Sequence, residues 1–88
     1  MNFIHAHEYL DDGDVVVVNS DTQCNVMLTD DLNFLAFKRG SRCTHYGGFY
    51  ERFPVRIAAP HSGWWNVTLD VGAGYEANIR YSIQIEKA

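Results

Sequence analysis

The sequence predicts an all-β domain, a small antiparallel sandwich or jelly-roll-like barrel of about six strands with one short helix. Apolar and polar residues alternate with a period of two in several segments, which is typical of strands with one wet and one dry face. Turn residues separate these segments at regular intervals. The chain has 88 residues, enough for a single domain over residues 1–88.

The first strands alternate with turns built on acidic residues and glycine. Residues 3–9 predict a weak strand, and Asp11–Asp14 predicts a turn because glycine and aspartate tolerate the required backbone angles. Val15–Val18 are all β-branched, so the strand predicted over residues 15–19 has both faces covered. A second turn is predicted at Ser20–Thr22.

A strand and the single helix follow. The segment Cys24–Leu28 alternates, and residues 31–38 fit a short helix with Thr29 or Asp30 as its N-cap and Gly40 after its end. The side chains that we expect to face the core are Cys24, Val26, Leu28, Leu32, Leu35 and Phe34.

The second half contains an irregular segment and then three alternating strands. Residues 40–51 show no regular pattern, and Gly47-Gly48 indicates a turn or a close backbone approach. Turns are predicted at Pro60–Gly63 and at Gly72–Gly74. The alternation directs these side chains inward: Phe53, Val55, Ile57, Trp65, Val67, Leu69, Val71, Ile79, Tyr81, Ile83 and Ile85. It directs these outward: Arg56, Trp64, Asn66, Thr68, Asp70, Asn78, Arg80, Ser82, Gln84 and Glu86.

Charge is unevenly distributed along the chain. The formal net charge is −4; residues 1–37 hold seven acidic and no basic side chains, whereas residues 38–56 hold five basic and one acidic. Overall acidity argues against a nucleic-acid partner. The N-terminus lacks the basic start and apolar core of a signal peptide, no apolar run is long enough for a membrane helix, and the two cysteines are fewer than in secreted scaffolds of this size. We therefore expect a cytoplasmic protein with reduced thiols and no membrane partner.

The basic and aromatic segment from Lys38 to Arg56 is the first candidate binding surface. Cations and aromatic rings together can hold phosphates and stack on bases or sugars. The residues selected for this role are Arg42, His45, Tyr46, Tyr50 and Arg52. The competing interpretation is that the aromatic side chains close one end of the sandwich and that the cations are solvated.

Two further groups of residues suggest chemistry in weaker form. His5 and His7 are two residues apart on a strand, so both side chains leave the same face, as in some zinc sites. No third ligand follows at a recognisable spacing, so polar residues on the wet face of an edge strand are the competing interpretation. Cys43 lies near Arg42 and His45, which could lower its pKa. The sequence contains no assembled catalytic motif, and we assign no catalytic residue, cofactor or metal.

Trp64 is the strongest sign of an interface. The alternation that buries Trp65 places Trp64 outside, and an exposed tryptophan suggests a protein interface or a platform for sugar stacking. A homodimer contact is our first interpretation, because a sandwich of 88 residues gains stability by burying this side chain.

Three blocks resemble a known family. They are Cys24–Phe34, Tyr46–Gly48 and Pro60–Asp70, and the opening with His5 and Gly13–Val16 fits the same pattern. Together they resemble the bacterial domain of unknown function 1883 family over nearly the whole chain. The resemblance implies an all-β sandwich that occurs alone or fused ahead of TIR domains. It implies a sensing or interaction role and brings no catalytic residue with it.

These observations favour a non-catalytic binding or sensing module for a small anionic or sugar-like ligand or for a protein partner. The alternative is a structural domain that associates with itself, with Trp64 between the copies. A third hypothesis is a metal- or thiol-dependent enzyme that uses His5 and His7, or Cys43.

Overall fold

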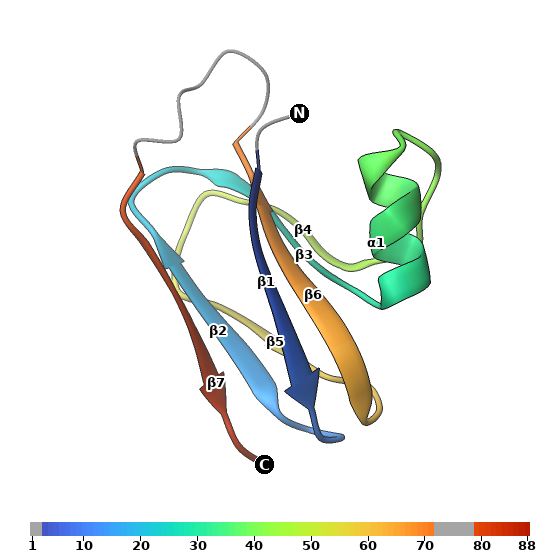
Figure 1. The fold of residues 1–88 in the computed structure, drawn as a ribbon. Helices are drawn as coiled ribbons and strands as arrows, with labels where there is room; N and C mark the ends of the chain where they lie inside the picture. Colours follow the sequence, from blue (N-terminus) through green and yellow to red (C-terminus); the bar gives the residue numbers. More distant parts are fainter. Residues whose placement is uncertain (1–2, 72–78) are drawn as a thin grey trace.

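The computed structural model describes residues 3–71 and 79–88, and these residues form two antiparallel sheets and one helix (Figure 1). The predicted antiparallel sandwich with one short helix is confirmed, with seven strands in the described residues in place of about six. Each sheet keeps two free edges, so these strands close no barrel. The predicted turn at Gly72–Gly74 and the outward position of Asn78 lie outside the described residues.

The larger sheet has four strands in the order β1-β6-β3-β4. The smaller has three strands in the order β5-β2-β7. The bounds of the strands are β1 Phe3–Leu10, β2 Val15–Ser20, β3 Cys24–Thr29, β4 Tyr46–Tyr50, β5 Val55–Ala58, β6 Gly63–Asp70 and β7 Tyr81–Glu86. The helix α1, Asp31–Lys38, lies beside the four-stranded sheet and contacts β3 and β6 (Figure 1). No helix within residues 3–71 and 79–88 is long and apolar enough to cross a membrane.

The core lies between the two sheets and follows the predicted alternation. The strand β2 is the middle strand of its sheet, and its Val16, Val17 and Val18 are all buried, which confirms that both of its faces are covered. The inner side chains of the other central strands are also buried, namely Cys24, Val26, Leu28, Trp65, Val67 and Leu69. The edge strands add partly buried side chains, among them Ile4, Tyr50, Ile57, Ile83 and Ile85.

The helix has the predicted bounds, and its cap is Asp30. The Asp30 Oδ1 accepts a hydrogen bond of 2.8 Å from the backbone amide of Asn33. After the helix, Gly40 adopts φ +73°, the left-handed conformation that commonly ends a helix.

The burial predicted for two helical leucines is wrong. Leu32 is 81% exposed and Leu35 is 40% exposed, whereas Phe34 is buried as predicted. The reason is that α1 does not pack between the sheets. It lies on the outer face of the larger sheet, where one row of aromatic side chains meets it, so the opposite leucines face solvent.

The irregular segment predicted over residues 40–51 contains the strand β4, which pairs with β3. Gly47 opposes Met27 in this pair and has φ +104°. A Cβ at Gly47 would collide with the carbonyl oxygen of Val26. The expected close backbone approach is therefore confirmed, but the alternative of a turn at Gly47-Gly48 is wrong.

The prediction that alternate residues of β6 are exposed is correct for Trp64 but wrong for Asn66 and Thr68. Trp64 is 54% exposed, but Asn66 and Thr68 are buried at 2% and 1%. They are buried because β6 is an inner strand, with β1 and β3 on either side and α1 against it. Tyr81, predicted to face inward, is 49% exposed because it begins the edge strand β7.

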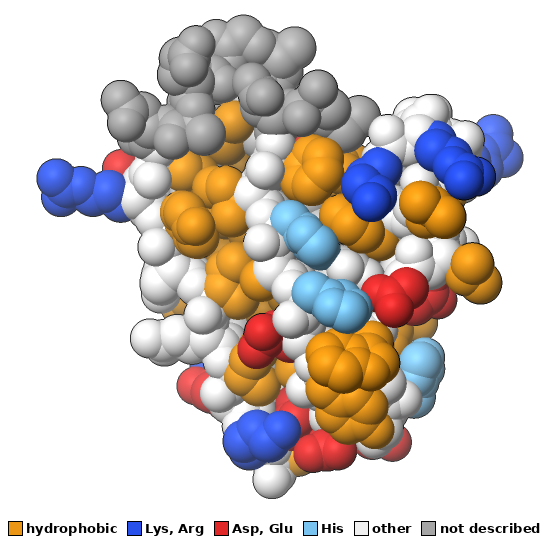
Figure 2. All heavy atoms as spheres, viewed as in Figure 1, with side chains coloured by type: hydrophobic (Ala, Val, Ile, Leu, Met, Phe, Trp, Pro, Cys, Tyr) orange, Lys and Arg blue, Asp and Glu red, His pale blue; other side chains and the backbone are white. Residues whose placement is uncertain are grey.

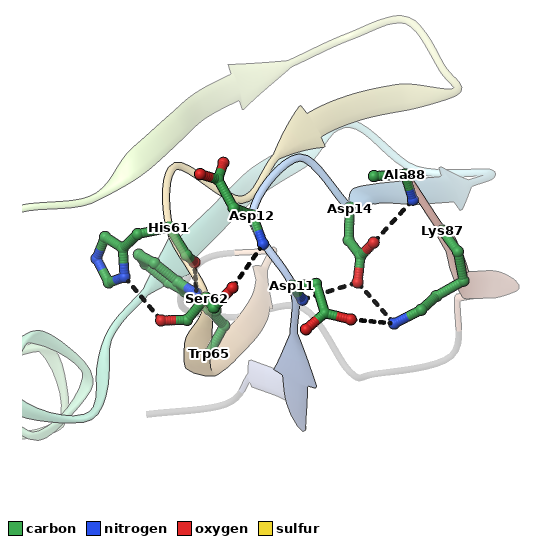
Figure 3. Close-up of polar contacts among 8 residues, drawn as sticks. All are labelled: Asp11, Asp12, Asp14, His61, Ser62, Trp65, Lys87 and Ala88. Atoms are coloured by element: carbon green, nitrogen blue, oxygen red, sulfur yellow. Dashed lines mark hydrogen bonds and ion pairs between the residues drawn. The ribbon is translucent and has the colours of Figure 1, made fainter.

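The acidic turn between β1 and β2 also holds the end of the chain (Figure 3). The carboxylate of Asp14 is buried and accepts hydrogen bonds from the backbone amides of Asp11 and Ala88, both at 2.8 Å. The ammonium group of Lys87 lies 2.7 Å from the same carboxylate. These contacts lower the pKa of Asp14 to about 2, with Lys87 as the main cause.

Candidate binding face

A row of aromatic rings lines the outer face of β1. Phe3, His5, His7 and Tyr9 alternate along the strand, and alternate residues of a strand share one face. Trp64 joins them from β6, and Phe34 and Phe37 join them from α1. We call these seven residues the ring ladder.

Contacts between neighbouring rings run along the whole ring ladder. The ring of His5 stacks on Phe34 with centroids 4.1 Å apart, and its centroid lies 6.5 Å from that of His7. The ring of His7 stacks on Trp64 at 4.8 Å. Trp64 in turn meets Tyr9 at 5.6 Å with planes 80° apart. Such geometries are favourable for aromatic pairs, so each ring helps to orient the next.

The strand register explains why these residues meet. In the antiparallel pair of β1 and β6, Tyr9 lies opposite Trp64 and His7 lies opposite Asn66. Residues opposite each other in such a pair share a face and lie close together. The Asp30 cap then begins α1 beside this face.

A network of polar side chains lies beneath the ring ladder. The Nε2 of His5 donates a hydrogen bond of 2.7 Å to Asn66 Oδ1. The Nδ2 of Asn66 donates to the carbonyl of Thr29 at 3.3 Å and to Asp31 Oδ1 at 2.8 Å. The Nε2 of His7 donates to the same oxygen of Asp31 at 3.0 Å. The buried amide of Asn66 therefore ties β1, β3 and β6 to the first turn of α1.

Asp31 gives this face a fixed negative charge. Its hydrogen bond from Asn66 lowers the pKa of its carboxyl group, and His7 lowers it further, although partial desolvation acts in the opposite direction. Asp31 thus stays ionised while its side chain remains 62% exposed. The strand β1 and the first turn of α1 contain no lysine or arginine that could neutralise it.

The end of the ring ladder that Tyr9 and Trp64 form is open to solvent. Trp64 is 54% and Tyr9 51% exposed, and their perpendicular rings form a corner. Figure 2 shows this face: two pale blue histidines lie near its centre, with large orange side chains directly below them and acidic side chains beside them. The part of the chain that the structure describes forms no pocket. The ring ladder is therefore an open surface.

The prediction that His5 and His7 leave the same face is confirmed. Both Nε2 atoms are already engaged by Asn66 and Asp31. Among residues 3–71 and 79–88, no group of three or more histidine, cysteine, aspartate or glutamate side chains is arranged to hold a metal ion. Hydrogen bonds thus hold His5, His7 and Asp31 in position, but the three side chains do not converge on a point where a metal ion could bind.

The basic and aromatic candidates are spread along one strand. Tyr46 and Tyr50 are the two ends of β4, Arg42 and His45 precede it, and Arg52 follows it. Tyr46 is 45% exposed with its ring against Trp65, and Tyr50 packs partly on the core. Arg42, His45 and Arg52 are exposed and make no hydrogen bond or ion pair with other described residues. The strand β4 therefore lies between the two arginines along the chain.

The two cysteines are not bonded to each other. Cys24 is fully buried, as predicted, and burial raises the pKa of its thiol. Cys43 is partly exposed in the loop before β4.

Sequence reasoning missed most of the ring ladder. It selected His5, His7 and Trp64 separately but not Tyr9 or the supporting Asn66 and Asp31. A signal was present for β1, because its residues 3, 5, 7 and 9 all carry rings. The contributions of Phe34, Asp31 and Asn66 depend on strand pairing and on the side of the sheet where α1 lies, which the local pattern does not contain.

Comparison with known proteins agrees with the sequence resemblance. The model of the family described as "Domain of unknown function (DUF1883)" matches residues 1–88, the whole chain, so the protein belongs to this family. No curated protein and no solved structure matches the chain.

Proposed function

We propose that this member of the domain of unknown function 1883 family is a non-catalytic protein-binding module and that the ring ladder is its docking face. The observation that carries the proposal is the half-exposed corner of Trp64 and Tyr9, held in place by His7. Large aromatic side chains that are pre-oriented but solvent-exposed are typical of binding hot spots.

The shape of the surface favours a macromolecule over a small ligand. Small molecules bind in concave sites that cover most of their surface. The described residues form no pocket, and the ring ladder follows the outer face of a sheet. A protein surface can cover such a face, whereas a nucleotide or a monosaccharide would stay mostly in water.

The charge of the surface favours a partner that presents a cationic side chain among apolar ones. The faces of tryptophan and tyrosine rings attract cations, and tryptophan does so most strongly. The ionised Asp31 lies next to this corner, because His7 contacts both Asp31 and Trp64. We therefore infer that an arginine or lysine of the partner lies between the aromatic corner and Asp31.

The polar groups in the ring ladder and beneath it favour a binding role over a catalytic one. His5, His7, Asn66 and Asp31 hydrogen-bond one another, so their donors and acceptors fix ring positions. A rigid face loses less conformational entropy when a partner binds.

Selection from a phage-displayed library of random peptides tests the proposal. The purified full-length chain should enrich peptides that carry arginine or lysine next to aliphatic or aromatic residues. Enrichment of these peptides should be lost for Trp64→Ala and kept for Tyr81→Ala, which removes another aromatic side chain that is 49% exposed and lies on the smaller sheet. Enrichment that survives Trp64→Ala, or a consensus without a cationic residue, would contradict the proposal.

Self-association through the same face is the second candidate, because Trp64 and Tyr9 together expose an apolar surface that a second copy could cover. Sedimentation equilibrium distinguishes it. A dimer that dissociates on Trp64→Ser would support self-association, whereas a monomer at all concentrations would remove it and leave the protein-binding proposal intact.

A further inference from the structure

The outer edge of β4 differs from the other sheet edges. Proteins usually protect an edge strand with charged side chains, proline or a covering segment, because its free backbone groups can pair with another strand. The edge strand β1 carries Glu8, β5 follows Pro54 and carries Arg56, and β7 carries Glu86. The strand β4 reads Tyr-Gly-Gly-Phe-Tyr and has no charged residue and no proline.

The backbone of β4 is accessible to a second strand. It is the last strand of its sheet, so only its inner edge pairs, with β3. A Cβ at Gly48 would meet no atom within 4 Å, so the face of the sheet over Gly48 is uncovered. Tyr46 and Phe49 are 45% and 55% exposed and could cover alternate side chains of an added strand.

Cationic side chains flank β4 in the sequence. Arg42 and His45 precede the strand and Arg52 follows it, and neither arginine forms an ion pair with another described residue. Glu51 is the one acidic residue between residues 38 and 56. A strand of five residues spans roughly 17 Å, so acidic residues at both ends of an added strand would lie toward the two segments that carry Arg42 and Arg52.

We propose that the outer edge of β4 binds an extended peptide with acidic residues at its ends, as a fifth strand of the larger sheet. Main-chain hydrogen bonds supply the attraction that any strand would share, and the arginines select the acidic ends. This surface is independent of the ring ladder, because β1 and β4 are opposite edges of the sheet.

Two synthetic peptides with exchanged charges test this proposal by NMR titration of the isotope-labelled full-length chain. The acidic probe is acetyl-Glu-Val-Thr-Val-Thr-Val-Glu-amide, and the basic probe has lysine at both ends. We expect the acidic probe to bind about fivefold more tightly than the basic one, as for two exposed ion pairs. Amide shifts and slowed hydrogen exchange should centre on Gly48 and Phe49.

The double variant Arg42→Glu/Arg52→Glu separates charge selection from strand addition. Both substitutions are at exposed loop positions, so the spectrum of the fold should be retained. The preference should reverse, with the basic probe binding more tightly. Equal binding of both probes to the wild type, no binding of either, an unchanged preference in the variant, or shifts that centre on another edge would overturn the proposal.

Discussion

Asp14 couples the stability of the fold to pH through a single carboxylate. It is buried, yet three donors surround it, from Asp11, Lys87 and Ala88 (Figure 3). Its pKa is lowered from 3.8 to about 2. A group with a lowered pKa stabilises the folded state above its unfolded pKa, and this contribution is lost as pH falls through the folded value.

We expect Asp14→Asn to lower the urea midpoint at neutral pH, because the amide cannot accept all three hydrogen bonds as an anion does. The difference from the wild type should narrow as pH falls from 3.8 to about 2, since the wild-type carboxylate is then protonated as well. Urea unfolding at a series of pH values measures this. Asp12→Asn is the control, and an Asp14→Asn difference that does not depend on pH would refute the assignment.

Asn66 has a comparable role beneath the ring ladder. Its amide accepts from His5 and donates to Asp31 and Thr29 while it is 2% exposed. We expect Asn66→Ala to lower the free energy of unfolding by about 1–3 kcal/mol, the usual effect of leaving buried polar partners unsatisfied. The pKa of Asp31 should rise toward its ordinary value, because Asn66 is the main cause of its lowering. An unchanged Asp31 titration by NMR would contradict this network.

At the scale of elements, Gly47 and Gly48 give a matched pair of substitutions. A Cβ at Gly47 would collide with the backbone of Val26, and φ +104° is unfavourable for other residues. Gly48 has neither constraint. We expect Gly47→Ala to destabilise the fold by at least about 2 kcal/mol and Gly48→Ala by less than about 0.5 kcal/mol. Equal effects in chemical denaturation would show that the close approach of β4 and β3 is not the cause.

The helix α1 gives a second matched pair of substitutions, because the sequence pattern predicted the wrong side chains at its contact with the sheet. Phe34 is buried with its ring stacked on that of His5, whereas Leu32 is 81% exposed. We expect Phe34→Ala to cost about 3 kcal/mol and Leu32→Ser to change stability by less than about 0.5 kcal/mol. Thermal unfolding of both variants checks this, and a larger effect of Leu32→Ser would mean that Leu32 packs against another surface.

These elements show what local sequence patterns can predict. The bounds of α1 followed from Asp30 and Gly40, since capping depends on neighbouring residues. The inward faces of β3 and β6 followed from alternation, and the coverage of both faces of β2 followed from its run of β-branched residues. The face of α1 did not, because eight residues offer several apolar positions and the sheet decides which is used. The strand β4 was missed because its pairing with β3 overrides the turn preference of two glycines.

For the whole molecule, the sandwich separates two surfaces of different chemistry. One edge of the larger sheet carries β1 with the ring ladder and Asp31, and the other is β4, which Arg42 precedes and Arg52 follows in the sequence. The sequence is acidic over residues 1–37 and basic over residues 38–56, but the fold does not place the two signs at opposite edges of one sheet: Lys38 lies over the ring of Phe34, and Arg56 is on β5 of the smaller sheet. The sequence pattern selected the basic segment as one binding site. In the structure the strand β4 lies between Arg42 and Arg52, so this segment contains an edge of the larger sheet.

The most direct test of the central proposal is a calorimetric titration of the full-length chain with a peptide selected on the ring ladder. We predict that Trp64→Ala weakens binding by at least about tenfold, as expected for an interface hot spot. Replacing the cationic residue of the peptide by glutamine should also weaken binding, whereas Tyr81→Ala should leave it unchanged. A Trp64→Ala variant that is folded and binds within about twofold of the wild type would contradict the assignment of the ring ladder as the docking face.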